Sequence, residues 1–258
     1  MLTIDIIYLY LILTCLSLLS FALSLVIKKT DLADFSWVVF IFIISLFGFF
    51  KYNYSFNIKD FIILGVTSIW SFRIGYLLIT RILNQSEDSR YAYLRKTYSK
   101  NSFYIFLLIF LIQPIFAISL AFPFLLIYKS DFNVSIFDFL GILIWLIGFI
   151  GVLVSDMQLK QFKNNRNRTT KVCKIGLWNY SRHPNYFFES VLWFSYPLFL
   201  VGTNYFLISL ISPILMLILL LYVTGVPHLE KRALETKGQE YLDYIKTTSK
   251  FFPFLKLK

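Results

Sequence analysis

The amino-acid sequence predicts an all-α polytopic membrane helix bundle of about seven transmembrane helices, with the N-terminus outside and the C-terminus in the cytoplasm. Three observations lead to this class: the chain is strongly apolar, its apolar residues form runs of membrane-spanning length, and its basic residues favour alternate connections. Of 258 residues, 58% are hydrophobic and only 15% are charged, whereas soluble domains are roughly a quarter charged. This composition excludes a disordered chain and disfavours an ordinary soluble domain.

Seven segments approach the length of about 20 apolar residues that a helix needs to cross the hydrocarbon core. The first is expected to be a true span and not a cleaved signal peptide, because it lacks a basic leading region and a small-residue cleavage site. The second and sixth are short, and each carries an acidic residue. In chain order the predicted spans are Ile6–Ile27, Asp34–Phe50, Phe61–Leu83, Phe103–Tyr128, Ser135–Asp156, Asn185–Leu200 and Tyr205–Val226.

The basic residues indicate how these spans are oriented. Seven spans place 21 Lys and Arg residues on one side and three on the other, with Arg73 inside the third span. The positive-inside rule assigns the basic side to the cytoplasm. We therefore expect one membrane-embedded domain over residues 1–258, whose polar tail forms an interfacial helix over 228–250 at the cytoplasmic surface.

The net charge of +11 carries little information about a ligand, because orientation and attraction to anionic lipid explain most of it. The basic residues are spread over membrane-proximal loops without a recognition motif, so no nucleic-acid partner is predicted. Cys15 and Cys173 form neither a disulfide framework nor a metal cluster, and no metal is expected. The lipid bilayer is the predicted partner, and the oligomeric state does not follow from the sequence.

Ionisable residues inside spans are costly and need a partner, a water-filled cavity or a ligand. Arg73 lies midway along the third predicted span, Asp156 ends the fifth, and Glu189 lies in the sixth. A structural ion pair and a ligand role both remain open for Arg73. Asp34 begins the second span, where an interfacial cap is the favoured interpretation.

The stretch from Gly176 to Glu189 gathers the largest number of polar groups beside a predicted helix start. Pro184 suits the first turn of a helix, so Asn185 and Glu189, four residues apart, share a face near its N-terminus. Free N–H groups and the helix dipole favour an anion there, and Arg182 and His183 add donors. Ordinary capping with a buried Glu189–Arg73 pair is the alternative.

This stretch also carries a resemblance. Together with Asp156-x-Gln158-Leu159 before it and Gly225-Val226-Pro227-x-Leu229-Glu230-Lys231 after it, it resembles a largely uncharacterised family of integral membrane proteins. That family is similar to the membrane steroid 5-alpha-reductases and, more distantly, to the isoprenylcysteine carboxyl methyltransferases. The resemblance covers about residues 30 to 255.

The resemblance implies a seven-helix enzyme that holds NADPH in a pocket open to the cytoplasm and reduces a carbon–carbon double bond conjugated to a carbonyl. The substrate is expected to be an apolar, lipid or steroid-like small molecule. By motif match, the implied cofactor contacts are Asp156, Asn185 and Glu189, with Tyr241 and Tyr244 in the tail. Arg182 and His183 join them on the physical argument above.

The chain departs from the reductase pattern in two places. Where the reductases use a tyrosine to polarise the substrate carbonyl, a gapless match places Trp70, which has an N–H donor but no phenol. Trp70 and Arg73 are therefore interpreted as substrate-contacting or structural residues. Asp34, Tyr76 and Tyr91 are candidates for the missing catalytic group, and none is assigned. In addition, Phe188 stands where the family usually has glycine.

Two other functions remain open. Arg182-His183-Pro184 and the later Glu230, Tyr241 and Tyr244 also resemble the isoprenylcysteine methyltransferases, which use S-adenosylmethionine. NADPH would need cationic partners for its 2′-phosphate, for which Arg166, Arg168 and Lys171 are available. A non-enzymatic lipid-binding membrane protein is the third possibility.

Overall fold

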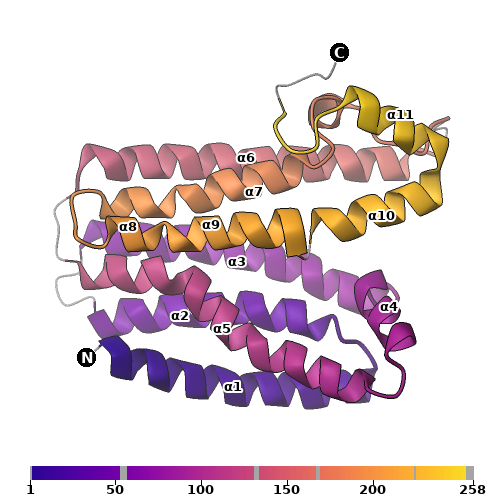
Figure 1. Cartoon of the computed structure of the whole chain (residues 1–258). Helices are drawn as coiled ribbons and strands as arrows, with labels where there is room; N and C mark the ends of the chain where they lie inside the picture. Colours follow the sequence, from indigo (N-terminus) through magenta and orange to yellow (C-terminus); the bar gives the residue numbers. More distant parts are fainter. Residues whose placement is uncertain (1, 53–56, 131–133, 167–168, 224, 254–258) are drawn as a thin grey trace. The chain divides into compact units, whose positions relative to one another are not determined.

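The computed structural model describes residues 2–52, 57–130, 134–166, 169–223 and 225–253, and it is helical throughout (Figure 1). Within this described part there is no strand, only an isolated bridge between Ser181 and Ser249. The all-α class is therefore confirmed. The chain divides into two compact units, unit 1 (Met1–Val134) and unit 2 (Ser135–Lys258). The single membrane-embedded domain stays a prediction.

Six helical segments of the described chain are long and apolar enough to cross a membrane. Their length and composition confirm a polytopic membrane protein, whereas the side that each connection faces stays a prediction. The segments are α1 (Leu2–Ile27), α2 (Leu32–Tyr52), α3 (Ile58–Asn84), α5 (Ser102–Lys129), α6 (Ile136–Asn164) and the run Phe206–Lys237.

The sixth predicted span, Asn185–Leu200, does not form a single spanning helix. An 11-residue helix, α7 (Pro184–Phe194), is followed by the five-residue 3₁₀ helix η2 (Tyr196–Leu200). Pro197 explains part of the break, because it has no N–H to donate to a carbonyl four residues back. At rises of about 1.5 and 2.0 Å per residue, α7 and η2 together extend roughly 26 Å. Among the described residues, six helical segments are thus long enough to span, where about seven were predicted.

In unit 1, the ends of three long helices meet at the short helix α4 (Ser89–Thr97). Lys29, directly after α1, donates through Nζ to the carbonyl oxygens of Ile82 and Gln85 at the end of α3. The backbone N–H of Thr30, just before α2, donates to Glu87 Oε1 at 3.0 Å. These connections therefore lie at one end of unit 1, as alternating spans require. A buried apolar cluster lies beneath them: Phe21, Leu32, Ala33, Ile82, Tyr91, Phe106 and Phe110.

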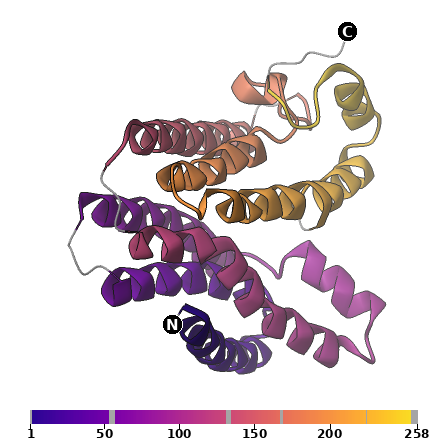
Figure 2. The same cartoon turned by 60° about the vertical axis from the view of Figure 1, so that its left-hand side comes forward.

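In unit 2, α6, α7 and the run from α8 to α10 lie side by side (Figures 1 and 2). Glycines on α6 allow α7 to approach closely. A Cβ atom at Gly148 would lie 2.6 Å from the backbone nitrogen of Leu192, and one at Gly151 would lie 2.2 Å from the ring of Phe188. Small residues at a helix contact are typical of packing between membrane helices. The run comprises α8 (Phe206–Ser209), α9 (Ile211–Ile218), the π-helix η3 (Leu219–Val223) and α10 (Val226–Lys237).

The polar tail forms two helices where one was predicted over 228–250. The first is α10, and the second is α11 (Gln239–Thr247). They are separated by Gly238, whose φ of 58° lies in the left-handed region that glycine adopts without strain. The interfacial position of the tail stays a prediction.

Candidate functional site

The site begins with a loop that closes against the end of α6. Gly176 opens the 3₁₀ helix η1 (Gly176–Asn179) with a φ of 53°, and a Cβ atom there would lie 2.2 Å from the Gln158 side chain. Gln158 Oε1 accepts the backbone N–H of Leu177 at 2.9 Å. The indole of Trp178 donates to the carbonyl oxygen of Ser155 at 2.9 Å. Three residues of the sequence motif, Gln158, Gly176 and Trp178, therefore build this turn.

Arg182 follows the turn and forms hydrogen bonds with other residues of the chain. Its Nε donates to Glu230 Oε1 at 2.8 Å, and one Nη donates to the carbonyl oxygen of Thr248 at 2.8 Å. Its backbone N–H donates to the carbonyl oxygen of Ser249 at 2.9 Å. Only 7% of the residue is exposed. Arg182 thus ties the loop before α7 to α10 and to the segment after α11, and its predicted cofactor contact stays a prediction.

Glu230 is the centre of this cluster, which we call the Glu230 cluster: Arg182, His183, Glu230 and Tyr241. The same oxygen, Oε1, lies 3.2 Å from His183 Nε2 and 3.5 Å from the Tyr241 hydroxyl. Burial lowers the pKa of His183, although the neighbouring Glu230 carboxylate opposes this effect. Burial and the same carboxylate raise the pKa of Tyr241 to about 12. The resting cluster therefore contains a neutral imidazole and a neutral phenol at neutral pH.

Tyr244 lies beside the cluster and supports the loop. Its hydroxyl donates to the carbonyl oxygen of Trp178 and lies 3.2 Å from that of Ser181. Tyr241 and Tyr244 pack with Val172 in a small buried core. The two tail tyrosines predicted to contact a cofactor are therefore buried on the loop and on Glu230, and their cofactor role stays a prediction.

Asp156 and Asn185 face each other across the contact of α6 and α7. Asn185 Nδ2 lies 3.5 Å from Asp156 Oδ1, and both residues are half-buried. Glu189, one turn further along α7, is 8% exposed and accepts the Trp193 indole N–H at 3.0 Å. The structure thus brings Asp156 and Asn185 together and places Glu189 on the same stretch of α7. His183 stacks on Tyr186 at the start of that helix, with ring centroids 5.9 Å apart.

The catalytic candidates Asp34 and Tyr91 lie together in unit 1. Asp34 Oδ1 accepts the Tyr91 hydroxyl at 2.7 Å, and Oδ2 accepts Nη2 of Arg90 at 2.5 Å and of Arg81 at 3.2 Å. Asp88 holds the same two arginines at 3.1 and 3.3 Å. We call these five residues the Asp34 cluster. Burial and the adjacent carboxylate raise the pKa of Tyr91 well above its ordinary value. The expected cap at Asp34 is therefore an ion-pair centre.

The remaining candidates of unit 1 lie along α3. Trp70 is buried and packs edge-on against Trp37 of α2, at 5.9 Å between ring centroids. Its position favours the structural interpretation. Arg73 is half-buried, and Tyr76 is exposed at the rim of an apolar groove between α2 and α3.

Sequence reasoning missed Glu230 as a site residue, although it lies in the Gly225–Lys231 motif. The available signal was charge: a motif that buries Arg182 needs a carboxylate, and Glu230 is the acidic residue in the second half of the same pattern. Among the residues that the structure describes, no group of three or more His, Cys, Asp or Glu side chains could hold a metal ion.

Residues 20–248 match the family described as a protein of unknown function, DUF1295. The chain belongs to this family. DUF1295 lies among the steroid 5-alpha-reductase-like membrane proteins, which agrees with the resemblance over most of its predicted extent. No curated protein and no solved structure matches the chain. Membership in DUF1295 assigns no activity.

Proposed function

We propose that this DUF1295 protein is a membrane-embedded, NADPH-dependent reductase of a carbon–carbon double bond conjugated to a carbonyl in a lipid or steroid-like substrate. The observation that carries the proposal is the meeting of Asp156 and Asn185 across α6 and α7, with Glu189 one turn away. These are the residues that the reductase resemblance marks as cofactor contacts. They come from distant parts of the sequence and lie at one place in unit 2.

The residues present fit a nucleotide on chemical grounds. Asp156 and Asn185 offer an acceptor and an amide that are only half-buried, and such groups suit a ribose or a carboxamide edge. Lys160 follows Asp156 by one turn and is exposed, as are Arg166 and Lys171. Exposed cations of this kind suit phosphate groups. Arg168, the third predicted phosphate partner, lies outside the described residues.

In the proposed reaction, bound NADPH would supply the hydride. The part of this chain's own residues would be binding and orientation. Asn185 and Asp156 would hold the polar edge of the nucleotide, and Glu189 would be kept in place by the Trp193 indole. The Glu230 cluster would fix the loop before α7, so that Asn185 keeps its position relative to Asp156. No proton donor is assigned.

A methyltransferase using S-adenosylmethionine is the second candidate, and one observation favours it. Three segments resemble the isoprenylcysteine methyltransferases, and they meet in the Glu230 cluster. They contain Arg182, Glu230 and Tyr241. Because Arg182 is bonded to Glu230 and to backbone carbonyls, we rank this function below the reductase.

Ligand-induced stabilisation separates the candidates. The full chain, purified in detergent, is titrated separately with NADPH and with S-adenosylmethionine while its thermal unfolding is followed. Selective stabilisation by NADPH is expected, because a ligand that binds only the folded state raises the unfolding temperature. Selective stabilisation by S-adenosylmethionine would overturn the reductase proposal, and stabilisation by neither would favour a non-enzymatic lipid-binding protein.

Variants of the site then test where NADPH binds. Asn185→Ala is expected to weaken NADPH binding by up to about tenfold, as the loss of a hydrogen bond does, with little change in the unfolding temperature without ligand. Asn164→Ala, at the exposed asparagine that ends the neighbouring helix α6, is the matched control and should bind NADPH normally. Equal binding by both variants would place the nucleotide elsewhere.

A further inference from the structure

Helix α1 lies beside α2 and α5 in unit 1 and packs on them through one face (Figure 1). Two hydrogen bonds fix its rotation about its own axis. The Tyr52 hydroxyl donates to Asp5 Oδ2 at 2.5 Å, and the Ser17 hydroxyl donates to the carbonyl oxygen of Phe110 at 2.5 Å. The buried residues of α1 all lie on this face: Asp5, Leu9, Leu13, Ser17, Phe21 and Ser24. The opposite face of α1 is exposed.

The residues along the middle of the exposed face recur with the heptad spacing of a coiled coil. Their separation alternates between four and three residues over nearly the whole helix. Because almost every residue of α1 is apolar, hydropathy does not distinguish this face, and its direction is visible only in the structure. We call the following residues, all of them exposed, the α1 seam: Ile4, Tyr8, Leu11, Cys15, Leu18, Ala22 and Leu25.

The shape of the seam suits a second helix with the same spacing. Its d positions carry large aliphatic side chains: Ile4, Leu11, Leu18 and Leu25. Its a positions are Tyr8 and the two small residues Cys15 and Ala22. Leucine at d is typical of parallel two-stranded coiled coils. Small residues between the leucines let two backbones approach closely, and left-handed packing of this kind is the commonest arrangement of membrane helices.

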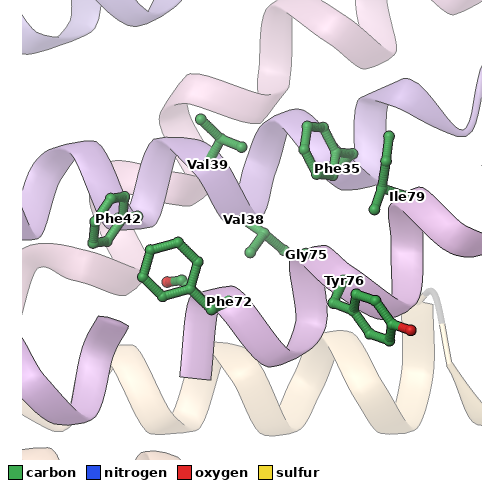
Figure 3. Close-up of a pocket in the computed structure, with 9 residues that line it drawn as sticks. Phe35, Val38, Val39, Phe42, Phe72, Gly75, Tyr76 and Ile79 are labelled. Carbon is green, nitrogen blue, oxygen red and sulfur yellow. The ribbon is translucent and has the colours of Figure 1, made fainter. Parts of the chain in front are cut away.

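The seam differs from the apolar groove between α2 and α3 in the same unit. Figure 3 shows that side chains from both helices, among them Phe35 and Phe72, line that groove. A flexible lipid chain fills a depression between two helices without needing a fixed period. The seam instead runs along a single helix, and its regular period matches the side chains of another helix.

The dimensions of the seam agree with a contact between whole membrane helices. From Ile4 to Leu25 the helix rises about 32 Å, close to the thickness of the hydrocarbon core. The five large side chains of the seam are 42% to 60% exposed, which corresponds to about 500 Å² at roughly 200 Å² per large side chain. Two copies would therefore bury about 1,000 Å² in total, the area that a specific interface needs.

We propose that the α1 seam is a homodimer interface, and that its partner is the α1 seam of a second copy of this chain. Copies of one membrane protein insert with the same orientation, so a two-fold axis along the membrane normal brings identical residues to the same depth. In such a pair each Leu11 faces the other Leu11, and each Cys15 faces the other Cys15. The contact needs α1 alone and does not depend on the proposed reductase activity.

The native cysteines test this contact without a substitution. The full chain is reconstituted at low density in phosphatidylcholine liposomes and oxidised with copper phenanthroline. The wild type should form a disulfide-linked dimer, because Cys15 is exposed at the centre of the seam, whereas Cys173 is buried. Cys15→Ser should abolish the dimer band, and Cys173→Ser should leave it unchanged. A wild type without a dimer band would overturn the proposal.

Two adjacent positions at nearly the same depth provide the matched control. Leu11 lies in the seam and is 53% exposed, whereas Ile12 lies beside the seam and is 52% exposed. In a Cys15→Ser background, Leu11→Cys should cross-link at least about tenfold faster than Ile12→Cys, because only the seam position holds two thiols in bonding geometry. Equal rates would overturn the proposal, since random collisions in the bilayer do not distinguish the two positions.

Single-molecule photobleaching of the fluorescently tagged chain in the same liposomes measures the dimer without cysteine chemistry. Leu11→Ala combined with Leu18→Ala should raise the dimer dissociation constant at least about tenfold, because it removes packing from the seam. Ile12→Ala combined with Leu23→Ala removes the same number of carbon atoms from exposed positions outside the seam and should not change it. A wild type that stays monomeric at every density would show that lipid or another segment covers the seam, and would overturn the proposal.

Discussion

The Asp34 cluster of unit 1 and the Glu230 cluster of unit 2 are built from similar parts. In each, one carboxylate receives an arginine and a tyrosine, and each ties a short polar segment to the ends of longer helices. They differ in what surrounds the arginine. Arg90 and Arg81 are shared between two carboxylates and have side chains 26% and 28% exposed, whereas the Arg182 side chain is 7% exposed and relies on one carboxylate and backbone carbonyls.

The comparison shows that the same residue types contribute differently to stability when their burial and their partners differ. An arginine with two carboxylates and partial hydration keeps a partner when one group is removed. A buried arginine with a single carboxylate leaves an uncompensated charge when the pair is broken, and this is the costly event. The stability of unit 2 should therefore depend strongly on Arg182. The stability of unit 1 should depend less on either Arg81 or Arg90, because the two share their carboxylate partners.

The largest expected difference comes from removing one arginine from each cluster. Arg182→Ala should lower the free energy of unfolding of unit 2 by about 3 kcal/mol, and Arg90→Ala should cost unit 1 about 1 kcal/mol. Cys173, which is 4% exposed in unit 2, reports this opening in a Cys15→Ser background. Its thiol-labelling rate should rise about a hundredfold in Arg182→Ala and stay unchanged in Arg90→Ala. Equal rates in both variants would contradict the comparison.

Removing the tyrosine hydroxyls should destabilise unit 1 more than unit 2, the reverse of the effect of removing the arginines. The Tyr91 hydroxyl lies 2.7 Å from Asp34, whereas that of Tyr241 lies 3.5 Å from Glu230. Tyr91→Phe should therefore cost about 1 kcal/mol, the net value of a good hydrogen bond, and Tyr241→Phe much less. Chemical denaturation of the two variants measures this difference. A larger loss of unfolding free energy in Tyr241→Phe would contradict the expectation that the shorter hydrogen bond contributes more.

The smallest expected effect is a pH dependence of unit 2 that His183 produces. Because burial lowers the pKa of His183, the folded state favours the neutral imidazole. The stability that this contributes is present above the ordinary pKa of about 6.5 and is lost as the pH falls through the lowered one, by at most about 1.4 kcal/mol per pH unit. The carboxyls of Glu87 and Asp88, whose lowered pKa values reflect their arginine partners acting against burial, titrate at much lower pH.

Thermal unfolding at pH 7.5 and pH 5.5 isolates the histidine. The wild type should lose stability between these values, and His183→Gln should lose less, because glutamine does not titrate. If the two proteins lost the same stability, a group other than His183 would control unit 2 in this range.

The sequence predicted the helices well where hydropathy decides them. The second span, predicted as Asp34–Phe50, is Leu32–Tyr52, and the fourth, predicted as Phe103–Tyr128, is Ser102–Lys129. It failed at Asn185–Leu200, because hydropathy records apolar character and not the change from an α-helix to a 3₁₀ helix that Pro197 accompanies. Gly238 similarly divides the tail at a backbone angle that composition does not reveal.

The candidate site was predictable only where its residues lie at helix ends that the motif identifies. Asp156 ends a predicted span and Asn185 begins the next, so their meeting follows from antiparallel neighbours. The partner of Arg182 could be suggested only by charge and by its place in the Gly225–Lys231 motif, because Glu230 is 48 residues away and no spacing rule connects positions so distant in the sequence. The engagement of Tyr244 with the Trp178 and Ser181 carbonyls is equally long-range.

The close fit of Gly151 against Phe188 has a consequence for how relatives of this protein can differ. A Cβ atom at Gly151 would meet the Phe188 ring. Bulk absent from one helix is thus supplied by the other, and neither position can enlarge alone. Gly151→Ala should therefore be tolerated only together with a smaller side chain at position 188. Such compensating change would preserve the spacing that brings Asn185 to Asp156.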